Sequence, residues 1–503
     1  MKKLVLTGFM LTAFATAYAQ NTSTVSQRGT SQTAEATQTG NQQTSTITQQ
    51  QGTATDAAPN VGNLGITIQN STAGPNTATI NQNDGAAANR AGITQTVGSN
   101  NAATINQNTG SGGGSTAADN SFDDGEPGNW AGILQQGSNG SATVNQNGNG
   151  TETSTSNFGE IYQYGTTGAA NTGTINQNNR SDDNDATITQ GTAGSAVFGN
   201  TATVSQSNNS SDNNATVTQP GNSNTATVNQ NGSLTGASSS NNDATVSQSG
   251  NSNTATVNQN SGMLGVSEFN VTDITQSGNS NTASVNQSNL SRYNETSIAQ
   301  IGNNNRAMVI QTRDSEYNQA TISQSGFNSE ATIEQYLFSG TGRSENNVAT
   351  INQGSGTSFS NATIRQRNAG DKDGVGGYGS GNTATINQNA NGGSGGSNTA
   401  SITQGRDFGT FVVDDNSATI NQTGRNNNAG VEQYDGDGNQ ATVTQIGSGT
   451  ANNQNFMRGI QTGSQNVLTV DQTVTSGAFT NTANITQTGM QNRAIVQQNG
   501  LGN

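Results

Sequence analysis

Few side chains in this sequence could carry out acid–base or nucleophilic chemistry, because its 503 residues include no His and no Cys. Two pairs of neighbouring carboxylates, Asp123/Asp124 and Asp414/Asp415, have the residue types of a general acid and a general base. The acidic residues lie mainly in predicted loops, where we expect solvated charges that discourage wrong strand pairing. The sequence therefore predicts a protein that is not an enzyme and that needs no cofactor.

Calcium binding is the stronger alternative for the acidic loops. The segment 435–439 begins like an EF-hand loop, but its twelfth position is Ile446 instead of Glu. The segment that begins at Asp371 fails in the same way, because Asn382 occupies the twelfth position. The Gly-rich run 110–115 lacks the following Lys that a phosphate-binding loop requires. We predict no dedicated metal site, with adventitious calcium binding at the acidic loops as the alternative.

Amide and hydroxyl groups dominate the polar chemistry of the chain. Ser, Thr, Asn and Gln make up nearly half of the residues, whereas hydrophobic residues make up only 28%. A chain of this composition cannot build several conventional apolar cores. Two classes remain, namely a polar disordered chain and a repetitive fold with a partly polar core.

A seven-residue frame, N-x-A-x-[IV]-x-Q, favours the repetitive fold. Asn253–Gln259 is one copy, and allowing one or two substitutions gives 34 units between Gln27 and Gln498. Low complexity alone would not keep Ala, Ile or Val, and Gln in phase over so many units, which argues against disorder. Further clear copies lie at 76–82, 101–107, 200–206, 224–230, 281–287, 347–353, 382–388, 416–422 and 481–487.

The period inside the frame is two, which indicates a β-strand. Asn, Ala, Ile or Val, and Gln occupy alternate positions and therefore share one face, while Thr, Ser and Asn fill the other. Short Gly-containing turns such as 248–253 join successive units, often at an 11-residue spacing. Longer and more variable loops connect one pair of units to the next pair, most clearly near 108–128 and 367–381. We therefore predict an all-β fold, a two-sheet β-solenoid of about 16–17 stacked strand-turn-strand coils.

Stacking explains why polar residues recur at inward positions. Each coil pairs with its neighbours about 4.8 Å away, and each inward amide can donate to the same residue of the next coil. We place Gly250 and Gly278 in turns. The predicted ladder residues in the middle of the chain are Asn224, Ala226, Val228, Gln230, Gln248, Asn253, Ala255, Val257, Gln259, Gln276, Asn281, Ala283, Val285 and Gln287.

The first residues have the pattern of a secretory signal peptide. Lys2 and Lys3 precede an apolar run from Leu4 to about Thr16, and Ala17-Tyr18-Ala19 forms a cleavage motif. The run is too short for a membrane anchor. We predict a signal peptide at 1–19 and one repeat domain at 20–503. The net charge of −15 makes nucleic acid a poor partner, and we predict no membrane insertion.

The repeats resemble the curlin repeats of bacterial curli fibres, whose pattern is S-x5-Q-x-G-x-G-N-x-A-x3-Q. Gln248, Gly250, Asn253, Ala255 and Gln259 match this spacing, while Asn242 replaces the Ser and Ser252 the second Gly. The copies that begin at Gln276 and Gln300 match likewise. The resemblance implies a secreted subunit of an extracellular amyloid fibre in the biofilm matrix. It also implies a nucleator subunit and an outer-membrane curli-type secretion pore as partners.

Self-assembly is expected at the ends of the stack, where an end coil exposes unpaired backbone groups and an Ala/Ile stripe. At the C-terminal end this assembly surface comprises Asn492, Ala494, Val496 and Gln498. Two alternatives remain: a nucleator or adhesin of the same fibre, and a monomeric ice-binding protein. The latter is suggested by the outward Thr-x-Thr rows, for example Thr254 and Thr256.

Overall fold

The computed structural model describes residues 20–28, 32–50, 62–71, 73–83, 89–108, 128–148, 156–165, 169–194, 197–233, 237–262, 265–339, 343–369, 378–389, 397–405, 413–447, 454–474 and 480–500. The predicted signal peptide at 1–19 lies outside these residues, as does most of the two long loops, at 109–127 and 370–377. Every regular secondary-structure element in the described part of the chain is a β-strand. It therefore contains no helix long and apolar enough to cross a membrane.

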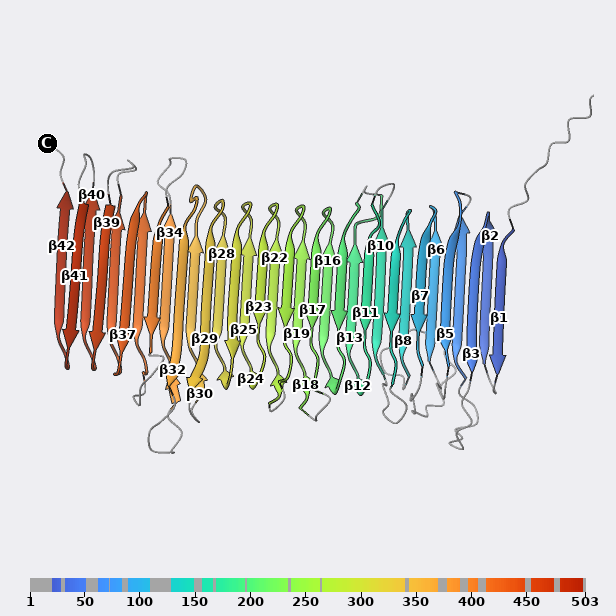
Figure 1. Ribbon diagram of the computed structural model, residues 1–503, viewed down its shortest axis with the longest axis horizontal. Coiled ribbons are helices and arrows are strands. Elements are labelled where there is room, and N and C mark those ends of the chain that lie inside the picture. The colour runs from blue at the N-terminus through green and yellow to red at the C-terminus, as the bar shows by residue number, and fades with distance from the viewer. Residues whose placement is uncertain are drawn as a thin grey trace, which may run out of the picture.

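The strands stack into a rod in chain order, from blue at the N-terminal end to red at the C-terminal end (Figure 1). Sheet A contains 17 parallel strands, each hydrogen-bonded to the next one named here. They are β1 (Thr22–Arg28), β3 (Gln43–Gln50), β5 (Asn76–Gln82), β7 (Asn101–Asn106), β9 (Ser141–Asn145), β11 (Thr172–Asn176), β14 (Thr201–Ser205), β17 (Thr225–Asn229), β20 (Thr254–Asn258), β23 (Thr282–Asn286), β26 (Arg306–Thr312), β29 (Glu330–Ser339), β32 (Asn361–Ala369), β35 (Thr399–Gln404), β37 (Asn427–Tyr434), β39 (Gln454–Thr462) and β41 (Thr480–Thr488).

Sheet B faces sheet A and also contains 17 parallel strands. They are β2 (Thr33–Gly40), β4 (Leu64–Ser71), β6 (Arg90–Thr96), β8 (Trp130–Gln136), β10 (Phe158–Tyr164), β13 (Asp185–Gln190), β16 (Asn214–Gln219), β19 (Asp243–Gln248), β22 (Val271–Gln276), β25 (Glu295–Gln300), β28 (Gln319–Gln324), β31 (Val348–Gln353), β34 (Thr383–Asn389), β36 (Ser417–Thr423), β38 (Gln440–Ile446), β40 (Val467–Val474) and β42 (Arg493–Gly500). The chain alternates between the sheets, so the predicted two-sheet β-solenoid is confirmed.

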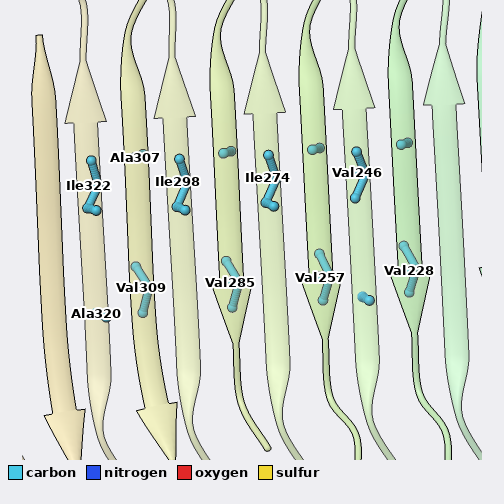
Figure 2. Packing of buried hydrophobic residues seen from close by; sticks show 14 of the residues in the cluster. Val228, Val246, Val257, Ile274, Val285, Ile298, Ala307, Val309, Ala320 and Ile322 are labelled. Atoms are coloured by element: carbon cyan, nitrogen blue, oxygen red, sulfur yellow. The ribbon is translucent and has the colours of Figure 1, made fainter.

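The pairing of residues between neighbouring strands follows the seven-residue frame of the sequence. Val228, Val257 and Val285 lie directly above one another in sheet A, as do the Ala residues two positions before them. Between the two end coils, most strands therefore bury an Ala and an Ile or Val. The inward rows of the two sheets run side by side along the rod (Figure 2). Burial of each Ile or Val contributes about 1.5–3 kcal/mol, which makes these rows the main apolar stabilisation of a polar chain.

A third, short sheet C lies on the loop side of the central coils and was not predicted. Its strands hold only two or three residues, too few for a period to be visible in the sequence. In five of the first six strands a buried Ser hydroxyl donates to the carbonyl of an inward Gln, as Ser239 does to Gln259 at 2.8 Å. Ser210 in the remaining strand accepts from Asn184 Nδ2 at 3.3 Å. The strands are β12 (Ser181–Asp182), β15 (Ser210–Ser211), β18 (Ser239–Ser240), β21 (Ser267–Glu268), β24 (Ser291–Arg292), β27 (Ser315–Glu316), β30 (Arg343–Glu345) and β33 (Tyr378–Ser380).

Candidate functional site: amide ladders and open ends

The structure places the fourteen predicted ladder residues inside the rod. Each is at most 1% exposed, because its strand turns that side chain toward the facing sheet. They belong to three consecutive coils around β17, β20 and β23 and to the Gln positions that end β19 and β22. These residues are thus brought together as stacked rows.

Gln side chains form two unbroken ladders along the described rod. In sheet A the ladder runs from Gln27 to Gln487, and each Nε2 donates to Oε1 of the Gln in the next coil at 2.7–3.0 Å. In sheet B the same contact repeats from Gln38 to Gln498 over the same range of distances. All donors point toward the C-terminal end, so the ladders have a direction.

Each Gln amide also joins the two sheets. Gln230 Nε2 lies 3.0 Å from the carbonyl of Asn214 and 2.9 Å from that of Asn242, both on the sheet B side. The Gln side chain therefore satisfies polar groups in its own row and on the facing strand. This explains why Gln holds an inward position that is costly for an unpaired amide.

The Asn residues in the central coils of sheet A bond differently from what the sequence suggested, because their side chains donate to turn carbonyls. Nearer the C-terminal end, Asn455 Nδ2 donates to Asn427 Oδ1 at 2.8 Å and Asn481 Nδ2 donates to Asn455 Oδ1 at 3.0 Å. Asn224 Nδ2 donates to the carbonyl of Gly250 at 2.8 Å, and Asn253 Nδ2 donates to that of Gly278 at 2.7 Å. Asn224 Oδ1 accepts the backbone N–H of Asn253 at 2.9 Å. The short Asn side chain thus fastens each turn to the next one. In sheet B, by contrast, Asn242 Nδ2 does donate to Oδ1 of Asn213, at 3.0 Å.

The turn glycines are required by this close stacking. A Cβ on Gly250 would lie 1.8 Å from the carbonyl oxygen of Gly278, and one on Gly278 would lie equally close to that of Gly302. A side chain at these positions would therefore push adjacent turns apart.

Replacing one Gln of a ladder should show how much that ladder contributes to the free energy of unfolding. Gln230→Leu leaves Gln259 Oε1 without its side-chain donor. It also removes the Gln acceptor of Gln206 Nε2, which keeps two backbone carbonyl acceptors, and it removes the amide that bonds the Asn214 and Asn242 carbonyls. We expect a loss of about 2–4 kcal/mol in the free energy of unfolding, because each unsatisfied buried group costs about 1–3 kcal/mol. Denaturant unfolding checks this. Asn229→Ala is the adjacent control, since Asn229 bonds Asn258 on the outer face; equal losses in both variants would contradict the assignment.

The two ends of the rod differ from its middle in exposure. Val25 in β1 is 46% exposed, whereas Val257 at the same position of β20 is 0% exposed. Ala34 and Ala36 at the N-terminal end, and Ile485, Ala494 and Val496 at the C-terminal end, are only partly buried. Within the described residues, β1, β2, β41 and β42 each pair with a strand on one side only.

The two ends also carry complementary hydrogen-bonding groups. Gln498 Nε2 donates to the Thr482 carbonyl at 2.9 Å, and no Gln of the described chain accepts its second proton. At the opposite end, Gln27 Oε1 and Gln38 Oε1 accept no hydrogen bond from a described residue. One end therefore offers side-chain donors and the other offers acceptors.

Carboxyl groups gather on the outer face of sheet B. Burial raises the pKa of Asp243 on β19, and the charge of Asp273 on β22 raises it further. Burial likewise raises the pKa of Asp273. An acid whose pKa is raised by folding destabilises the fold when it is ionised. The stability of the rod should therefore increase as the pH falls through these raised values, and level off below the ordinary value of 3.8.

This pH dependence can be measured as the denaturant midpoint between pH 7 and pH 4. Asp243→Asn should raise the midpoint at pH 7 and flatten its rise at lower pH, because one ionisable partner is gone. Thr245→Asn on the same strand is the control and should keep the slope of the parent. A midpoint that falls on acidification in the parent would contradict the prediction.

The acidic loop residues that the structure describes show no metal-binding geometry. Asp414 donates its backbone N–H to Asp437 Oδ1 at 3.3 Å, which ties two neighbouring loops together. The described part of the chain contains no cluster of three acidic side chains that could hold a metal ion. Asp123, Asp124 and Asp371 lie outside the described residues.

Aromatic stacks are a feature that the repeat frame does not encode. Phe269, Tyr293 and Tyr317 stack on the loop side with ring centroids 4.9 and 4.8 Å apart. Trp130 and Phe158 stack at 4.3 Å on the outer face of sheet B. The sequence signal for the first stack is the aromatic residue at the same offset before three successive frames.

Two segments of the chain match a family model, that of the curlin associated repeat, at residues 240–263 and 414–447. The first covers β19, the turn at Gly250 and β20, and the second covers β36, β37 and β38. The resemblance to curlin repeats is thereby confirmed in these segments. No curated protein sequence matches the chain.

Proposed function

We propose that this protein is a structural subunit that assembles end to end into curli-like extracellular fibres. The observation that carries the proposal is the pair of open ends, each with one-sided strand pairing and complementary Gln groups. The curlin repeats and the β-solenoid support a structural fibre subunit. Secretion through an outer-membrane pore and growth from a nucleator subunit belong to the same proposal.

The ends fit each other in register. A copy placed on the C-terminal end would set β1 on β41, so that Val25 meets Ile485 and Gln27 Oε1 meets Gln487 Nε2. It would also set β2 on β42, so that Ala36 meets Val496 and Gln38 meets Gln498. Both sheets would continue as parallel strands without a break in either Gln ladder, and the partly buried apolar residues of both ends would leave water.

Charge on the outer face favours the same arrangement. In this register Glu35 of one copy lies diagonally across from Arg493 of the next, on adjacent strands of sheet B. Such diagonal neighbours are about 7–8 Å apart, within reach of a long side chain. A contact between different ends does not close on itself and generates an open filament.

Electron microscopy of the purified chain without residues 1–19 tests the proposal. We expect unbranched fibres with a cross-β repeat of about 4.8 Å along the axis. Monomeric rods at every concentration and time would overturn it. Growth on short sonicated seeds, followed with a length marker, should show that one end accepts new copies faster than the other, since the two ends differ chemically.

The outer face of sheet A supports a second candidate, ice binding. Thr201, Thr225 and Thr254 lie in register on successive strands, with a second Thr row two residues further on. Regular hydroxyl rows on a flat face can order water. An ice recrystallisation assay separates the candidates, because the fibre proposal requires no effect on ice.

A further inference from the structure

A groove crosses the turn edge of the rod, opposite sheet C. It lies over three successive turns, those that join β25 to β26, β28 to β29 and β31 to β32, and it encloses about 500 Å³. Ligand sites commonly have volumes of about 300–1,000 Å³. Its lining combines two phenyl rings with glycine backbone and neutral polar side chains: Gly302, Asn303, Ser325, Gly326, Phe327, Gly356, Thr357, Ser358 and Phe359.

Phe359 is a groove residue whose side chain local structure does not explain. It has a left-handed backbone with φ of 54° and is 65% exposed. The preceding coils place Asn328, Asn304 and Ser280 in the same backbone conformation at this point of the turn. A bulky side chain is disfavoured there, whereas Asn tolerates the conformation. Neither backbone preference nor burial therefore accounts for the phenyl ring.

The aromatic stack on the opposite edge offers a comparison. Phe269, Tyr293 and Tyr317 also have positive φ, but each packs its ring against a neighbour, which compensates the strain. Phe327 and Phe359 make no ring contact with each other or with another described residue. Their apolar surface remains available to a ligand.

The polar groups of the groove are incompletely bonded. An exposed ladder of Asn amides runs along the turn edge and ends at Asn303, whose Oδ1 accepts from Asn279 at 3.2 Å. No described residue accepts a hydrogen bond from Asn303 Nδ2, because Phe327 replaces Asn in the next turn. Ser358 in the groove lining is only 9% exposed, and its Oγ has no hydrogen-bond partner. An unsatisfied buried hydroxyl costs about 1–3 kcal/mol, which a bound group could recover.

We propose that this groove binds a neutral hexopyranose unit of a polysaccharide. A sugar ring has an apolar C–H face that can pack on the phenyl rings, and hydroxyls that can bond Asn303 Nδ2 and Ser358 Oγ. The lining contains no charged side chain, which favours a neutral ligand in a chain of net charge −15. The proposal goes beyond fibre assembly, since the groove lies on the side of the rod.

The Asn ladder that leads to the groove indicates how a longer ligand would lie. Asn222, Asn251 and Asn279 repeat the same exposed amide once per coil. Successive sugars of a chain aligned with the rod axis could bond successive amides. We therefore place the saccharide chain along the turn edge, with one unit held against Phe327 and Phe359.

Titration calorimetry with the chain lacking residues 1–19, as monomer and as fibre, tests this proposal. The probes are cellohexaose, laminarihexaose and maltohexaose as neutral ligands, and hexagalacturonic acid as the charged one. We expect at least one neutral hexasaccharide to bind, and Phe359→Asn to raise its Kd at least tenfold. Ser358→Ala should raise the Kd severalfold, because it removes the buried hydroxyl.

Two controls separate binding from stability. Phe359→Asn should not lower the denaturant midpoint, because Asn occupies this backbone conformation in the preceding coil. Phe269→Asn removes an aromatic residue of the same backbone conformation from the opposite edge and should leave the Kd unchanged. Absence of binding to every neutral hexasaccharide, unchanged affinity in Phe359→Asn, or equal affinity for hexagalacturonic acid would each overturn the proposal. Saccharide binding by a monomer that forms no fibres would leave it intact while contradicting the assembly function.

Discussion

Val257→Asp is expected to abolish the ordered rod around the central coils. Val257 is 0% exposed and lies between Val228 and Val285 in the apolar row of sheet A (Figure 2). A carboxylate there would be buried without a partner, which costs about 3–5 kcal/mol. We expect a large fall in the denaturant midpoint, rapid proteolysis between β17 and β23, and little fibre growth at neutral pH.

Thr256→Lys is the matched control, because Thr256 is the preceding residue and lies on the outer face of the same strand. A surface substitution of this kind usually changes stability by less than about 0.5 kcal/mol. Fibre growth and protease resistance should therefore resemble those of the parent. If the two variants behaved alike, the division of each strand into an inner and an outer face would be wrong.

The inner face could be predicted because it depends on a local rule that repeats. Ala255, Val257 and Gln259 alternate with Thr and Asn, so a period of two assigns them to one side before any contact is known. The same frame in neighbouring units then fixes the register, since a slip of one residue would turn Val257 outward. The Gln rows follow from the same reasoning.

Features that depend on contacts between different coils were not predictable in this way. Asn253 and Gln259 are both inward amides, yet Asn253 bonds a turn carbonyl while Gln259 bonds the next Gln. The difference arises from side-chain length and from the approach of Gly278, which are properties of the assembled turn. The buried Ser residues of sheet C and the groove at Phe359 likewise lie outside the frame, where single residues carry no periodic signal.

The direction in which each backbone N–H group points at the C-terminal end determines which substitution tests assembly. In the stack, outward residues such as Thr254 donate their N–H to the next coil, and inward residues such as Gln259 donate to the preceding one. At the last strand, the carbonyl of inward Asn492 accepts from Val467 of β40. The N–H of outward Ile495 therefore faces the free end, whereas that of inward Val496 points back into the rod.

Ile495→Pro should therefore stop growth at the C-terminal end without harming the monomer. Ile495 is 54% exposed, and proline is tolerated on a sheet edge where its missing N–H faces solvent. In a fibre the same N–H would donate to β2 of the next copy, so its loss together with the proline ring should slow elongation at this end at least tenfold. Seeded growth measures the rate, and protease resistance of monomer measures folding.

Val496→Pro is the adjacent control with the opposite expectation. It removes a ladder donor that points toward β40, so it should loosen the last coil of the monomer before any assembly takes place. If Ile495→Pro elongated from both ends like the parent, head-to-tail addition through β42 would be wrong, although the fold would stand. The two substitutions differ by one residue and by the side of the strand that they affect, so together they separate damage to the coil from damage to the contact between copies.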